Sequence, residues 1–90
     1  MNVSSVVVKA MPENLNDVLK SLSSSGLCEV HFHDEMGRIV VTIEGESLGE
    51  EVSKMKAIMN IPNVVCADLA YSYSEEELHD ALLHLRKMET

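Results

Sequence analysis

The stretch LCEVHFHDEMGRIVVTIEG, residues 27–45, decides the fold. Side chains in a strand alternate between the two faces of a sheet. Cys28, Val30 and Phe32 alternate with polar residues, and are therefore expected on the core side. Asp34–Gly37 has the composition of a tight turn, and the run RIVVTIE alternates again after it. Residues 27–45 therefore predict a β-hairpin, to which the other elements are added.

The N-terminal part predicts a strand over residues 3–10 and then a helix. Pro12 is tolerated in a first helical turn because the N–H that it lacks would be unpaired there. Gly26 suits the left-handed position that ends a helix. The apolar stripe of this helix has the spacing i, i+3, i+4, i+7. It consists of Leu15, Val18, Leu19 and Leu22.

A helix and a strand are expected after the hairpin. Ser47 and Glu50 form a capping-box pattern, and Pro62 ends the helix that they open. The apolar stripe of this helix consists of Leu48, Val52, Met55 and Met59. The segment NVVCADLAYSY, residues 63–73, predicts the last strand. The residues expected on its core side are Val65, Ala67, Leu69 and Tyr71.

A further helix is expected at the C-terminus. Ser74 and Glu77 repeat the capping-box pattern. The apolar positions that follow are Leu78, Ala81, Leu82 and Leu85. We expect residues 1–73 to form one domain and residues 74–90 to form a helix appended to it.

The order of the first six elements is the βαββαβ pattern of the ferredoxin-like α+β fold. Right-handed crossovers place both crossover helices on one face of an antiparallel sheet. The first and third strands are the most apolar and are therefore expected at the centre. The sequence thus predicts a four-stranded sheet in the order 4-1-3-2.

The other face of this sheet is expected to have no crossover helix over it. The C-terminal helix could lie across this face or pack elsewhere, and we expect packing that leaves much of the face free. Val7 and Val40 occupy positions where a solvated face would carry polar side chains. Acids and imidazoles surround them, and an apolar centre with a polar rim is typical of a docking surface. The residues predicted on this open face are Ser5, Val7, Glu29, His31, His33, Val40, Thr42, Val64, Cys66, Asp68 and Ala70.

Composition narrows the possible partners. The net charge of −8 disfavours nucleic acid and anionic membranes and favours basic partners. The sequence shows no signal-peptide pattern and no apolar run of membrane-spanning length. The two cysteines form no CxxC pair, which favours a reducing cytoplasm.

No catalytic or metal-binding constellation is predicted. His31 and His33 share one predicted strand face, but two histidines supply only half of a zinc site. Cys28 is expected toward the core and Cys66 away from it, which argues against a disulfide. There is no Ser-His-Asp or Cys-His pattern and no phosphate-binding glycine loop. We expect a non-enzymatic protein without metal or cofactor.

The runs SSVVVKA (4–10), LCEVHFHDEMGRIVVTIEGE (27–46) and IPNVVCADLAYSY (61–73) resemble the NapD family. These are the small cytoplasmic chaperones of periplasmic nitrate reductase, and the resemblance covers about residues 3–73. It implies binding of the twin-arginine signal peptide of the catalytic subunit, which holds back export until the molybdenum cofactor is loaded. The peptide-binding residues would be Ser5, Val7, Glu29, Val40, Thr42, Cys66, Asp68 and Ala70.

Alternatives to the chaperone remain open at this stage. The same βαββαβ order occurs in ACT- and Lrp-type regulatory domains, which bind small effectors. A structural homodimer could also bury the open face, and a weak homodimer is compatible with the chaperone. The solution mass with and without a twin-arginine peptide separates these alternatives.

Overall fold

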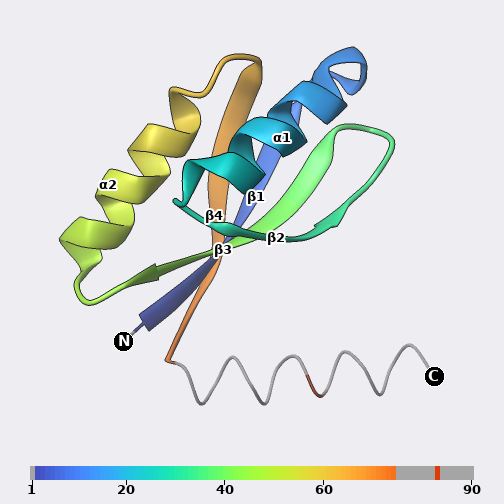
Figure 1. Ribbon diagram of the computed structural model, residues 1–90. Coiled ribbons are helices and arrows are strands. Elements are labelled where there is room, and N and C mark those ends of the chain that lie inside the picture. The colour runs from blue at the N-terminus through green and yellow to red at the C-terminus, as the bar shows by residue number, and fades with distance from the viewer. Residues whose placement is uncertain (1, 75–82, 84–90) are drawn as a thin grey trace.

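The computed structural model describes residues 2–74 and residue 83. The elements are β1 (Asn2–Ala10), the 3₁₀ turn η1 (Pro12–Asn14), α1 (Leu15–Ser25), β2 (Glu29–His33), β3 (Arg38–Gly45), α2 (Leu48–Met59) and β4 (Val64–Ser74). The strands form one antiparallel sheet in the order β2-β3-β1-β4, and both helices lie on one side of it (Figure 1). The predicted ferredoxin-like fold and strand order are therefore confirmed. The helix predicted over residues 74–90 falls outside the described residues apart from Ser74 and Leu83.

The hydrophobic core lies between the sheet and the two helices. Every second residue of β1 and β3 points into it, which follows from the alternation of side chains along a strand. Val18 and Leu22 of α1 and Ile58 of α2 pack against these strand residues. The fully buried strand residues are Val6, Val8, Ile39, Val41 and Ile43. The predicted stripe of α1 is confirmed, with Leu15 and Leu19 partly buried at its margin.

The predicted helix ends agree with the structure. Gly26 ends α1 in the left-handed conformation, with φ of 71°, where a side chain would be strained. Ser47 caps α2, because its Oγ accepts a hydrogen bond of 3.2 Å from the backbone N–H of Glu50. The Glu50 carboxylate in turn accepts from the backbone N–H of Glu46 at 3.2 Å. The return bond thus lies one residue before the position expected of a capping box.

Of the stripe predicted for α2, only Met55 packs against the core, and the prediction is wrong for the other three residues. Leu48 is 73% exposed, and Val52 and Met59 are exposed as well. The residues of α2 that face the sheet are instead Glu51 and Ile58, with Met55 partly buried between them. These positions have the spacing i, i+4, i+7 of one helical face. On this face the Glu51 carboxylate has a buried partner on β1.

That partner is Ser4. Its hydroxyl donates a hydrogen bond of 2.5 Å to Oε1 of Glu51, and the two residues are 4% and 6% exposed. A buried polar group is costly unless it is hydrogen-bonded. The pairing therefore lets an acid occupy the inner face of α2. A sequence pattern that assigns only apolar residues to a buried face could not predict that Glu51 lies there.

Register shifts in the β1–β4 ladder change the predicted faces of β4. Ala10 pairs with Val64 while Lys9 pairs with Cys66, so Val65 is an extra residue in the ladder. Val64, predicted on the open face, packs against the core, and Val65, predicted to be buried, is 62% exposed. Ala67 is buried as predicted, whereas Leu69 pairs with the buried Val6 but is itself 54% exposed. The side chain of Tyr71 is outside the described part of the chain.

Candidate docking surface on the open sheet face

The sheet face opposite the helices, called the open face below, carries a central row of residues that runs from edge to edge. Phe32 on β2 lies opposite Val40 on β3, which lies opposite Val7 on β1, which lies opposite Asp68 on β4. Val7 and Val40 are partly buried and Asp68 is exposed. Directly opposite residues in an antiparallel ladder lie on the same face. The row is therefore an apolar strip that ends in a carboxylate.

Phe32 reaches this row through a β-bulge. Val30 pairs with Val41 and Phe32 pairs with Val40, so His31 is an extra residue between them. An extra residue reverses the alternation of everything that follows it in the strand. The prediction that Phe32 faces the core is wrong: its side chain is 61% exposed and lies opposite Val40. His33, predicted on the open face, instead lies opposite the core residue Ile39.

A second row of the open face is polar. Glu29 lies opposite Thr42, which lies opposite Ser5. The Nε2 atom of His31 is 2.7 Å from Oγ1 of Thr42 and 3.9 Å from a carboxylate oxygen of Glu29. His31 contacts Thr42 on the open face, whereas His33 lies opposite a core residue. The two histidines therefore do not share a face. The predicted pairing of these histidines on one face is therefore wrong.

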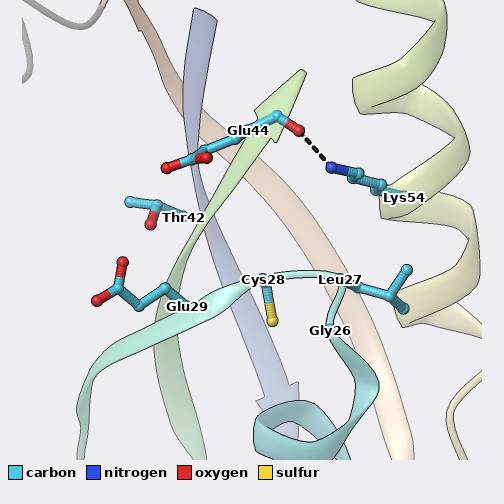
Figure 2. Close-up of a pocket in the computed structure, with 7 residues that line it drawn as sticks. All are labelled: Gly26, Leu27, Cys28, Glu29, Thr42, Glu44 and Lys54. Atoms are coloured by element: carbon cyan, nitrogen blue, oxygen red, sulfur yellow. Dashed lines mark hydrogen bonds between the residues drawn. The ribbon is translucent and has the colours of Figure 1, made fainter. Parts of the chain in front are cut away.

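Carboxylates flank Thr42 at this end of the open face. Glu44 follows Thr42 by two positions along β3 and therefore lies on the same face. The side chains of Glu29, Thr42 and Glu44 extend to the same side in Figure 2. Both acids are exposed. We name Glu29, Thr42 and Glu44 the acidic end of the open face.

The opposite end of the open face is basic. Arg38 lies opposite Lys9, which lies opposite Cys66. The Arg38 side chain donates a hydrogen bond of 2.6 Å from Nε to the carboxylate of Asp34, so its charge is locally matched. Lys9 is exposed and forms no ion pair with any residue that the structure describes. The open face thus has opposite charges at the two ends of its central strands.

The structure places nearly all of the predicted peptide-binding residues on one surface. The residues brought together are Ser5, Val7, Glu29, Val40, Thr42, Cys66 and Asp68. Ala70 is exposed but lies at a register shift, where Ser5 pairs with Tyr71 and Val6 with Leu69. Sequence reasoning missed Phe32, because the polar–apolar alternation of HFH gives no sign of the bulge. It also missed Glu44, which the predicted strand parity could have identified.

A polar hollow of about 240 Å³ lies beside the acidic end (Figure 2). Lys54 lies at one edge of it, where its Nζ donates a hydrogen bond of 2.7 Å to the backbone carbonyl of Glu44. Cys28 also lines the hollow, and burial raises the pKa of its thiol. A raised pKa disfavours the thiolate that nucleophilic or metal-binding chemistry requires. Cys28 is therefore disfavoured as a nucleophile.

The described residues contain no group of three or more potential metal ligands among His, Cys, Asp and Glu. Both cysteines are free thiols. Neither of the described helices has the length and apolar character needed to cross a membrane. The surface that distinguishes this part of the chain is the open face, and its chemistry is that of an apolar strip between charged ends.

Comparisons with known proteins give relatives of this chain. A model of the NapD protein family matches residues 1–76. The chaperone NapD of Escherichia coli strain K12 is 29% identical over 76 residues, which are 83% of this chain and 87% of that protein. The chaperone NapD of Shigella flexneri matches to the same extent. The relatives are named chaperones, and that role is non-enzymatic, in agreement with the prediction from the sequence.

A solved structure matches as well. The solution structure of the E. coli Tat proofreading chaperone protein NapD has a TM-score of 0.71 and 29% sequence identity to this chain. The match covers 83% of this chain and 80% of the other. The family match over residues 1–76 spans the sheet and both helices described above.

Proposed function

Because the chain belongs to the NapD family, we propose that it is a cytoplasmic chaperone that binds a twin-arginine signal peptide on its open face. The peptide would be that of the catalytic subunit of a periplasmic nitrate reductase. Its capture holds back export until the molybdenum cofactor is loaded and the enzyme is folded. The chaperone itself needs no cofactor for this role, because binding alone withholds the peptide.

The observation that carries this proposal is the composition of the open face. Val7 and Val40 lie on the sheet face that has no described helix over it, so they have no part in the core. An apolar centre supplies favourable burial on binding, about 25 cal/mol for each Å² of apolar surface removed from water. A signal peptide offers an apolar segment that can cover this strip.

The charges of the open face suit the other part of such a peptide. Arginine binds carboxylates through charge-assisted hydrogen bonds, which fix register and contribute to specificity. Glu29 and Glu44 at the acidic end, with Asp68 at the β4 edge, are exposed carboxylates within this face. The net charge of −8 also attracts a basic peptide at long range.

Titration of the full chain with a synthetic twin-arginine signal peptide tests this function. We expect saturable binding by calorimetry. In NMR spectra the largest shifts should occur for open-face residues such as Val7, Val40 and Thr42. Residues on the outer surface of α1, such as Lys20, should shift little. Absence of binding, or shifts centred on the helices, would contradict the proposal.

Burial of the open face in a homodimer is the competing outcome. Sedimentation of the free chain over a range of concentrations distinguishes it. A monomer agrees with the chaperone, and so does a weak dimer that dissociates when peptide is added. A tight dimer that is unaffected by peptide contradicts it and supports a structural role for the apolar strip.

A further inference from the structure

We propose that Phe32 is the aromatic anchor of the open face, the residue that contributes most to holding the apolar segment of the bound peptide. This inference rests on the proposed function and names a specificity-determining residue within it. The chain contains one Phe and no Trp, so Phe32 has few aromatic counterparts. Its placement depends on the β-bulge at His31 and not on the alternation of the sequence.

The exposure of Phe32 has no explanation within the described fold. The residue is 61% exposed, and it is absent from the partly buried side chains that pack against the core. Its neighbour Val30 does pack there, as a core-facing residue of β2 should. A regular β2 would place Phe32 opposite Ile39 and bury it. The bulge instead removes the largest apolar side chain of β2 from the core, and bulges commonly re-aim side chains at functional positions.

Phe32 completes an apolar strip of a definite width. It continues the row formed by Val40 and Val7 across adjacent strands β2, β3 and β1. Neighbouring strands are about 4.8 Å apart, so the centres of this row span about 10 Å. This width is close to the diameter of a single α-helix with its side chains, about 10–12 Å. The strip therefore fits one face of a single helical apolar segment.

The position of Phe32 also fits the energetics of interfaces. Affinity is concentrated in a few residues, among which aromatic side chains are enriched. Val7 and Val40 are already partly buried, so covering them removes little further surface from water. Phe32 retains most of its exposed area, and an aromatic side chain has a large area to bury. Covering the strip therefore removes more apolar surface from water at Phe32 than at either valine, and so stabilises the complex more there.

Peptide affinity of Phe32→Ala and Phe32→Leu tests this inference. We expect Phe32→Ala to raise the Kd at least tenfold and Phe32→Leu to raise it less. Met36→Ala is the matched control, because Met36 is 71% exposed in the same hairpin but lies in the turn. Its Kd should equal that of the parent chain. All these side chains are exposed, so the folded state should be retained in each variant.

A second readout uses the single Phe directly. In a full chain labelled with ring-¹³C phenylalanine, the only ring signals belong to Phe32. They should shift on peptide addition and show nuclear Overhauser contacts to the apolar segment of the peptide. An unchanged Kd in Phe32→Ala together with loss of binding in Val40→Glu would overturn the anchor role and leave the proposed function standing. Unchanged affinity in both variants would overturn the proposed function itself.

Discussion

Ser4 and Glu51 are joined by a hydrogen bond of 2.5 Å that links β1 to α2 inside the protein. The bond runs from the serine hydroxyl to a carboxylate oxygen, and both residues are buried. Hydrogen bonds to charged groups contribute more to stability than bonds between neutral groups. A buried charged acceptor that is left without a partner costs more free energy than a neutral one. The contact ties the inner face of α2 to β1, while Leu48, Val52 and Met59 on the helix remain exposed.

Loss of this bond should destabilise the fold. Ser4→Ala removes a hydroxyl partner of the buried carboxylate and should lower the free energy of unfolding by about 1–3 kcal/mol. Urea denaturation followed by circular dichroism measures it. Ser53→Ala is the control, since Ser53 is exposed on α2, and it should change stability by less than about 0.5 kcal/mol. Equal stabilities of the two variants would show that the Ser4–Glu51 bond contributes nothing.

Asp34 should make the hairpin sensitive to acid. The backbone N–H of Arg38 donates to its carboxylate at 3.1 Å, and this bond, with those from the Arg38 side chain and the Met36 backbone, lowers the pKa of Asp34. A carboxyl whose pKa is lower in the folded state stabilises that state above the unfolded pKa, about 3.9 for Asp. That contribution is lost as the pH falls through the lowered folded value.

The pH dependence of Asp34→Asn tests this assignment. The parent chain should lose stability more steeply than the variant as the pH falls below about 4, and the two profiles should become parallel above about 5. The difference between the profiles isolates Asp34 from the other carboxylates. Profiles that remain parallel down to the lowest pH at which the chain folds would contradict the role of Asp34.

The sequence predicts the fold well because the fold depends on periodicity. The alternation in β1 and β3 and the stripe of α1 involve apolar residues that reach the core without polar partners. The errors occur where a single local contact or an inserted residue overrides periodicity. Glu51 occupies the inner face of α2 through its bond to Ser4, and the bulge at His31 moves Phe32 to the other face.

The candidate site is predicted in part for the same reason. Val7, Val40 and Thr42 lie on regular strands, so parity places them correctly. Residues beyond a bulge, such as Phe32 and His33, cannot be placed by parity. No residue type in EVHFH marks the extra residue, because the bulge depends on pairing with a distant strand. The aromatic component of the open face is therefore visible only in the folded ladder.

Charge reversal at the rim should weaken peptide binding modestly. Glu29→Lys and Asp68→Lys remove exposed carboxylates from the open face, and each should raise the Kd by a factor of about two to five at low salt. The effect should shrink toward 1 M salt, where the Debye length is about 3 Å. Glu13→Lys makes the same charge change in η1, next to α1 and away from the strand ladders. Calorimetry should show a clearly smaller effect for Glu13→Lys, and equal effects would indicate only general attraction.

The unequal ends of the open face should orient the peptide. The paired arginines should lie toward the acidic end, near Glu29 and Glu44, and away from Lys9, which has no ion-pair partner among the described residues. A nitroxide label beside the arginines of the peptide should broaden the NMR signals of Thr42 more than those of Lys9. The reverse pattern of broadening would show that the peptide docks in the opposite direction.

The central claim is that the open face binds the signal peptide, and titration of Val40→Glu with that peptide tests it most directly. Val40 points away from the core, so the variant should fold, as its circular dichroism spectrum can confirm. An unpaired carboxylate at the centre of the apolar strip should cost several kcal/mol on desolvation, which raises the Kd about a hundredfold or more. A folded Val40→Glu variant that binds the peptide with the parent affinity would contradict the account.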